Sequence, residues 1–138
     1  MPVFASETEG ANEYAIQNAA QIHDNALRWV FDTFSIDEEG LRSRLIARLG
    51  LKKHQTVLIT GAGAGNDLPY LAKEMGNTGV IYAQDIALEM LLSSIDRFGR
   101  AVEKAGIPVH VSASDATNLP FIKLGDDSKL RVGEWVLA

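Results

Sequence analysis

An apolar run followed at once by three alternating glycines constrains the fold of this chain more than any other feature. Residues 57–60 (Val-Leu-Ile-Thr) are apolar and mostly β-branched, which is typical of a strand buried on both faces of a parallel sheet. The next five residues are Gly61, Ala62, Gly63, Ala64 and Gly65. Because glycine has no side chain, such a loop can turn tightly and a ligand can come close to its backbone. The pattern predicts a strand that leads directly into a glycine loop, which either binds a ligand or is a purely structural turn between strand and helix.

A helix is expected immediately after the glycine loop. Asn66 can cap it, Pro69 falls in its first turn, and Gly76 ends it. The start of such a helix offers unpaired N–H groups and a partial positive charge, which suit a carboxylate or a phosphate. The loop and this helix together therefore predict a site for an anionic group.

The alternation of strand and helix continues along the chain. Residues 79–83 predict a second strand that ends at Asp85, and residues 108–112 predict a third that ends near Asp115. A longer helix with apolar residues on one face separates these two strands. Strands and helices that alternate in this way form right-handed βαβ units. We therefore predict an α/β fold with a Rossmann-like parallel sheet.

The part of the chain before the first strand has a different character. Residues 1–13 are small and polar without periodicity, and we expect them to lack regular structure. From Tyr14 to Gly50 two amphipathic helices are predicted. We expect residues 1–50 to form a helical cap and residues 51–138 to form the core domain.

Composition excludes several classes of function. The formal net charge of −5 argues against non-specific binding to nucleic acid. The arginines at positions 42, 44 and 48 are expected to form a solvated helix face. There is no cysteine, and the three histidines lack the spacing of a metal site, so no metal is expected. No segment resembles a signal peptide or a membrane span, and a cytoplasmic location is the default expectation.

Two acidic residues strengthen the prediction of a ligand site. Asp85 follows Gly65 by twenty positions at the end of the second predicted strand, where a carboxylate can accept hydrogen bonds from both hydroxyls of a ribose. Asp115, at the end of the third, could reach the exocyclic amine of an adenine. Either residue alone could equally be a loop or helix-cap residue. Adjacent parallel strands end at one edge of a sheet, so the combination predicts an adenosine-binding site.

Three segments resemble the motifs of class I S-adenosylmethionine-dependent methyltransferases. The first is residues 57–65, the second is residues 79–86 with Glu89-Met90-Leu91 after it, and the third is residues 114–121, which contains an Asp-Ala pair followed by Leu-Pro-Phe. The resemblance covers roughly residues 49–121 and is closest to the ubiquinone and menaquinone methyltransferase subgroup. It implies S-adenosylmethionine as cofactor and, as partner, a small-molecule substrate.

The resemblance also implies roles for individual residues. The loop residues Gly61, Ala62, Gly63 and Gly65 would hold the methionine part of the cofactor. Asp85 would bind the ribose, Ile86 would pack on the adenine, and Asp115 with Ala116 would contact the adenine edge. The N-terminal helices would cover the site, with Tyr14 near the cofactor. No catalytic residue is implied.

The sequence departs from the family pattern in two places. Ile59 stands where the family has an acidic residue that orients the amino group of the cofactor. After the third motif only residues 122–138 remain, where the family continues for roughly a hundred residues more. We therefore expect a truncated sheet of three or four strands, in which residues 129–138 form one short strand. A fragment, an absent segment between Phe121 and Ile122, or a partner chain that completes the sheet would each account for this, and the first two are favoured. A homodimer is a further expectation.

Two other functions stay open. A short-chain-type NAD(P)-dependent oxidoreductase would use a similar loop and the same two aspartates, but Asp67 would then lie beside a pyrophosphate, where a negative charge is costly. Its Tyr-x-x-x-Lys pair is also absent. A non-catalytic binding module that keeps the nucleoside-binding fold is the second alternative, and Ile59 and the short C-terminal part favour it.

Overall fold

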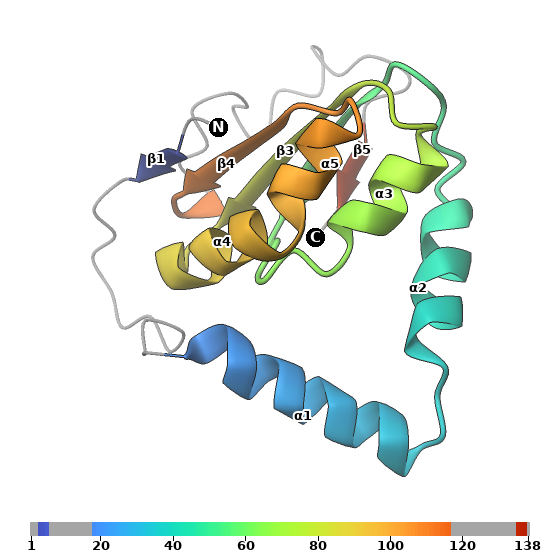
Figure 1. Ribbon diagram of the computed structural model, residues 1–138, viewed down its shortest axis with the longest axis vertical. Helices are drawn as coiled ribbons and strands as arrows, with labels where there is room; N and C mark the ends of the chain where they lie inside the picture. Colours follow the sequence, from blue (N-terminus) through green and yellow to red (C-terminus); the bar gives the residue numbers. More distant parts are fainter. Residues whose placement is uncertain (1–2, 6–17, 117–134, 138) are drawn as a thin grey trace.

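Five parallel strands form one sheet at the centre of the molecule. The computed structural model describes residues 3–5, 18–116 and 135–137. The strands are β1 (Val3–Ala5), β2 (Thr56–Thr60), β3 (Val80–Asp85), β4 (Val109–Ala113) and β5 (Trp135–Leu137). Their spatial order is β1-β4-β3-β2-β5, and every pairing is parallel (Figure 1). The predicted α/β fold with a Rossmann-like parallel sheet is confirmed.

The register of β2, β3 and β4 separates two faces of the sheet. Val57, Ile81 and Val109 form one row across the three strands, and all three are fully buried. On the opposite face, Tyr82 is in register with His110, and their rings stack with centroids 5.0 Å apart. One face therefore carries the hydrophobic core, and the other carries a half-buried aromatic pair.

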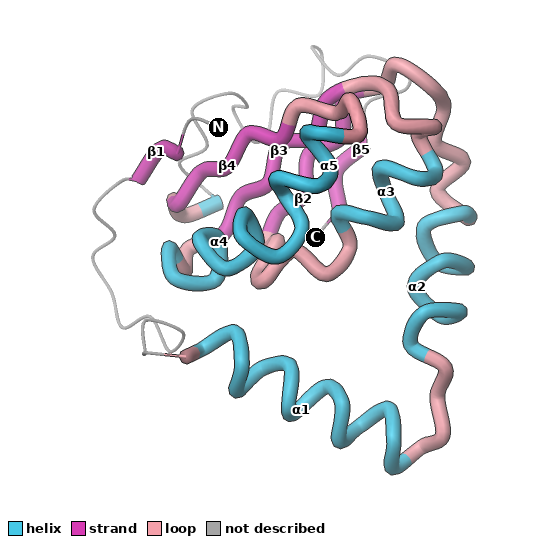
Figure 2. Tube along the Cα trace, viewed as in Figure 1, coloured by secondary structure: helices cyan, strands magenta, loops and turns pink. Residues whose placement is uncertain are grey.

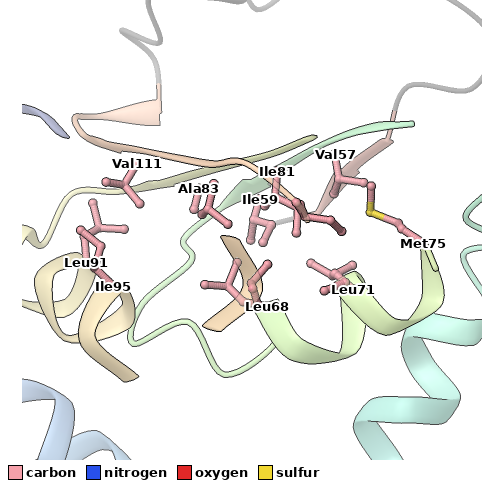
Figure 3. Close-up of a cluster of buried hydrophobic side chains, with 14 of the residues drawn as sticks. Val57, Ile59, Leu68, Leu71, Met75, Ile81, Ala83, Leu91, Ile95 and Val111 are labelled. Atoms are coloured by element: carbon pink, nitrogen blue, oxygen red, sulfur yellow. The ribbon is translucent and has the colours of Figure 1, made fainter. Parts of the chain in front are cut away.

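Four helical segments follow the loops of this sheet. They are α3 (Leu68–Glu74), α4 (Leu88–Ser94), the π-helical turn η1 (Ile95–Gly99) and α5 (Arg100–Lys104). Figure 1 shows α3, α4 and α5 on the same side of the sheet. Leu68 and Leu71 of α3 and Leu91 of α4 are completely buried against the strand residues (Figure 3). Burial of such side chains is the main stabilisation of this layered arrangement.

Two N-terminal helices flank this core. They are α1 (Ala19–Thr33) and α2 (Glu38–Ala47), and both are confirmed as helices. Figure 2 shows that α1 leads away from the core and that α2 stands beside α3. The first turn of α1 packs near α4, but the apolar face farther along it is open, with Trp29 66% and Phe34 67% exposed. Periodicity thus predicted the helix correctly, although most of its apolar stripe is not buried.

Several details differ from the sequence-based expectations. Val3–Ala5 is a strand at one edge of the sheet, so the expectation that residues 1–13 lack regular structure is wrong for these three. For the same reason the sheet has five strands rather than three or four. Trp135–Leu137 confirms part of the predicted C-terminal strand, while Tyr14 and residues 117–134 lie outside the described residues. None of the helices in the described part of the chain is long and apolar enough to cross a membrane.

Candidate functional site

The glycine loop leaves β2 as a tight turn that is tied to β3. The N–H of Ala62 donates to the carbonyl of Gln84 at 2.9 Å, which extends the pairing of the two strands by one more bond. The N–H of Gly65 then donates to the carbonyl of Ala62 at 3.0 Å and closes the turn. All three loop glycines have positive φ angles, which side-chain-bearing residues adopt only with strain.

Gly63 and Gly65 differ in what surrounds them. A Cβ atom on Gly65 would lie 2.6 Å from the Cβ of Ser94, so this glycine lets α4 pack directly against the loop. A Cβ atom on Gly63 would meet only the Cε of Met90, at 3.6 Å. Gly65 is therefore required for packing, whereas the backbone at Gly63 has space beside it that a ligand group can use.

Asp85 connects the loop to the end of β3. Its Oδ2 accepts a hydrogen bond from the N–H of Gly63 at 2.7 Å, and its Oδ1 accepts one from the N–H of Ala87 at 2.8 Å. Each carboxylate oxygen has a second lone pair, so these bonds leave acceptor capacity for ribose hydroxyls. The carboxylate is thus a structural tie and a candidate ligand-binding group at the same time.

The remaining predicted residues lie at the same edge of the sheet. Ile86 follows Asp85 directly and is 41% exposed. Asp115 and Ala116 follow β4 and are half-buried. The N–H of Ser114 donates to the carbonyl of Asp85 at 3.0 Å, which joins the ends of β3 and β4. The structure therefore brings the glycine loop and all the predicted residues to the carboxyl ends of three adjacent strands.

Next to this edge, α1 makes its contact with the core. Ala19, in the first turn of α1, forms a small buried cluster with Ala64 of the glycine loop and with Ala87 and Met90. A groove of about 510 Å³ runs from there between α1 and α4. Ala20 also packs against this cluster, and Asp24 of α1 pairs with Arg97 at 2.7 Å. Sequence periodicity did not identify these contacts, because they lie outside the apolar stripe of the helix.

Buried polar groups gather on the other side of the β3 end. Gln84 is 3% exposed, and its Nε2 donates to the carbonyl of Ser114. The hydroxyls of Ser112 and Ser114 are 3.1 Å apart. Each of these three residues is buried, so the carboxyl edge of the sheet is polar on this side and apolar on the helix side. The sequence-based interpretation did not single out these residues.

Asp67, rather than the predicted Asn66, occupies the cap position of α3, and Pro69 lies in the first turn as predicted. The Asp67 side chain makes no capping hydrogen bond, and its Oδ1 lies 2.6 Å from Nη1 of Arg42 in α2. Nε of Arg42 is 2.8 Å from Oε1 of Glu38. The prediction of a solvated face is therefore wrong for Arg42, whose side chain is 17% exposed.

The charges around Arg42 alter its protonation equilibrium. Burial lowers the pKa of Arg42, but its hydrogen bonds to Glu38 and Asp67 and the two nearby negative charges outweigh burial, so the pKa is raised above its usual value. The group stays cationic. Since the charge of Asp67 is paired, it opposes a bound pyrophosphate less than the sequence alone indicated.

Ile59 stands where the sequence motif predicts an acidic residue. It is 6% exposed and belongs to the hydrophobic core between the sheet and the helices. Its side chain therefore offers no polar atom to a ligand.

Comparison with known proteins gives structural similarity only. No family model matches the chain, and no curated protein matches it. A candidate S-adenosyl-L-methionine-dependent methyltransferase from Methanococcus maripaludis matches over 83% of this chain and 48% of its own length, with a TM-score of 0.55 and 20% identity. A SAM-dependent methyltransferase from Aquifex aeolicus matches over 57% of this chain and 40% of its own length, with a TM-score of 0.49 and 34% identity.

The chain thus spans less than half the length of either structure. The match to the Methanococcus maripaludis structure covers most of this chain and shows a common fold. The chain therefore shares the Rossmann-like α/β fold of that structure.

Proposed function

We propose that this chain binds S-adenosylmethionine and serves as the cofactor-binding part of a methyltransferase that acts on a small molecule. The observation that carries the proposal is the hydrogen bond between the Gly63 N–H and Asp85. It holds an open stretch of loop backbone and a carboxylate together at the carboxyl ends of β2 and β3, where folds of this type bind nucleosides. The sequence motifs and the common fold also support S-adenosylmethionine binding at this edge of the sheet.

Each predicted residue has a role in this proposal. The backbone of Gly61, Ala62 and Gly63 receives the amino-acid end of the cofactor, while Gly65 keeps the loop against α4. Asp85 accepts hydrogen bonds from the ribose, and the exposed Ile86 packs on the adenine. Asp115 and Ala116 contact the adenine edge. These assignments rest on the sequence motifs and on the shared location of the residues.

When bound, the cofactor supplies a methyl group on a positively charged sulfonium. Transfer of that group to a nucleophile depends mainly on positioning and on exclusion of water. In this chain the loop backbone and Asp85 would fix the orientation of the cofactor. The contact of Ala19 with Ala64 and Ala87 would restrict water on the side of α1. We assign no general base, because such a base is needed only when the acceptor must lose a proton.

A nicotinamide-dependent oxidoreductase is the alternative that the paired charge of Asp67 keeps open. Against it, the described tyrosines lack a lysine four positions on: Glu74 follows Tyr70, and Ile86 follows Tyr82. The two cofactors also differ in charge, since S-adenosylmethionine has no pyrophosphate. Direct comparison of the two ligands decides between them.

The test is isothermal titration of the chain with S-adenosylmethionine, S-adenosylhomocysteine and NAD⁺. Binding of the two sulfur nucleosides at micromolar concentration, with weaker or no binding of NAD⁺, supports the proposal. No heat with either sulfur nucleoside at millimolar concentration would overturn it. Tight binding of NAD⁺ instead would favour the oxidoreductase. Methyl transfer then distinguishes an enzyme from a module that only binds.

Four finer statements belong to the same proposal. The motifs place the chain nearest the ubiquinone and menaquinone methyltransferase subgroup. Apart from Val3–Ala5, which belong to the central sheet as β1, residues 1–50 act as a cap over a core formed by residues 51–138. A homodimer is proposed as the assembly and the cytoplasm as the location. Size-exclusion chromatography with light scattering tests the dimer.

A further inference from the structure

Charged groups cluster where α2 meets the start of α3. Arg42 bridges Glu38 and Asp67 with two different nitrogens of its guanidinium group, Nε and Nη1. Four charged groups act on the pKa of the neighbouring Tyr70: the carboxylates of Glu38, Glu39 and Asp67, and the cation of Arg42. One cation therefore stands against three carboxylates at this junction.

This junction adjoins the glycine loop. Asp67 follows Gly65 by two positions, so their Cα atoms are at most about 8 Å apart. That separation is no longer than the distance over which dissolved salt screens a charge, about 8 Å at physiological ionic strength. An unpaired Asp67 carboxylate would therefore repel an anionic group held by the loop. The pairing with Arg42 offsets part of that repulsion, although Arg42 is shared with Glu38.

We propose that Arg42 is a positioning residue for the carboxylate end of the ligand. It acts through Asp67, by offsetting the negative charge of that carboxylate next to the loop. The inference rests on the proposed function, because it assumes that the loop receives a ligand carboxylate. The motifs quoted above do not include Arg42, which lies in α2, 25 positions before its partner in the chain.

The geometry explains why an arginine stands here. A guanidinium group presents several N–H donors in a fixed plane, so one side chain can hold two carboxylates at different edges. The pairing with Glu38 lies within α2, whereas the pairing with Asp67 crosses to the start of α3. Arg42 thus joins the cap helix to the start of α3 by a partly buried charged contact, in which the Arg42 side chain is 17% exposed and the Asp67 side chain 44% exposed.

Two ligands separate this role from a general structural one. S-Adenosylhomocysteine carries the amino-acid end, and 5′-methylthioadenosine is the same nucleoside thioether without it. Arg42→Met is expected to weaken binding of S-adenosylhomocysteine about five- to tenfold and to leave 5′-methylthioadenosine within twofold of wild type. The matched control is Arg44→Met, an exposed arginine of the same helix, which should leave both affinities unchanged.

Two further variants keep the inference testable if Arg42→Met folds poorly. Arg42→Met with Asp67→Asn removes both charges and should return S-adenosylhomocysteine affinity to within about twofold of wild type. Asp67→Asn alone should bind S-adenosylhomocysteine at least as tightly as wild type. Thermal unfolding of each variant checks that the fold is retained.

The outcomes separate the two proposals. If wild type binds neither ligand, the proposed function fails. If wild type binds S-adenosylhomocysteine but Arg42→Met weakens both ligands equally or neither, Arg42 does not act on the carboxylate end and the inference fails. Weaker binding of S-adenosylhomocysteine by Asp67→Asn would overturn it as well, because Asp67 would then be a ligand contact.

Discussion

The N–H of Gly63 and the Oδ2 of Asp85 are 2.7 Å apart, and this bond joins the glycine loop to the end of the neighbouring strand. The other carboxylate oxygen of Asp85 accepts from the N–H of Ala87 at 2.8 Å, so one side chain holds both the loop and the entry to α4. The two features that the sequence pairs as a ligand site are thus also in direct contact. Any variant of Asp85 will consequently affect stability as well as binding.

Asp85→Ala should lower the free energy of unfolding by about 1–3 kcal/mol, because two backbone N–H groups lose a charged acceptor. Affinity for S-adenosylhomocysteine should fall by about 1–3 kcal/mol if the ribose is also bound here. Urea denaturation and calorimetric titration measure the two effects. Asp96→Ala is the control, because Asp96 pairs with Arg100 at 3.1 Å on the exposed surface and its loss should cost little. Equal stability of the two variants would contradict the structural role of Asp85.

Gly63→Val should abolish detectable binding of S-adenosylhomocysteine, because the branched side chain would fill the space beside the loop backbone. The substitution also strains the backbone, since φ of Gly63 is +52°. Gly50→Val matches that strain, with φ of +63°, and has no atom within 4 Å of its Cβ position. Calorimetric titration should therefore show binding by Gly50→Val and none by Gly63→Val. Normal binding by Gly63→Val would remove the loop from the site.

Gly65→Ala should destabilise the fold by about 2–4 kcal/mol, because it combines a strained φ with a Cβ that overlaps Ser94. The contact of 2.6 Å with the Ser94 Cβ suggests a compensating change. Adding Ser94→Gly to Gly65→Ala should recover part of the loss, after subtraction of the cost of Ser94→Gly alone. Chemical denaturation of the four proteins gives the coupling energy. A coupling near zero would mean that the loop and α4 are not in tight contact.

The phenol of Tyr70 reports on the charges around Arg42. Burial raises the pKa of Tyr70, the charge of Glu39 raises it as well, and the charge of Arg42 lowers it. The difference in tyrosinate absorbance between wild type and Tyr70→Phe, followed as a function of pH, should therefore give a pKa above the usual value for tyrosine. In Arg42→Met the same difference should appear at still higher pH. An unchanged or lower pKa in that variant would place Arg42 away from the cluster.

The sign of the linked effect on stability follows from the raised pKa. The folded state holds the phenolic proton of Tyr70 more tightly than the unfolded chain does. The stabilisation that results is therefore complete at pH values below the pKa of tyrosine in the unfolded chain. It is lost as the pH rises through the folded value. Relative to Tyr70→Phe, wild type should thus become less stable in strongly alkaline solution.

The central strands and the site residues were predictable because their signals are local. A short β-branched run ending in Gly61 marks β2, and similar runs predict β3 and β4 with boundaries within one or two residues of those observed. Since parallel strands end at one edge, residues that follow them, such as Asp85 and Asp115, had to lie near one another.

Other features depend on contacts between distant segments and have no local signal. The three residues of β1 form a strand only because β4 is beside them. The pairing of Arg42 with Asp67 crosses from α2 to α3, and a pattern of arginines on one helix face cannot show it. The sequence does not indicate the contact of Ala19 with the loop either, because an alanine fits almost any position of a helix.

The strand order also has a kinetic consequence. β2, β3 and β4 are consecutive along the chain and adjacent in the sheet, whereas β1 and β5 come from the two ends of the sequence and add to opposite edges. Closing a long stretch of chain costs more entropy than closing a short one, and contacts of high sequence separation form slowly. We therefore expect residues 56–113 to make up the folding nucleus, with the outer strands joining last. Amide exchange should be slowest in β3, which is flanked by a strand on each side within that nucleus.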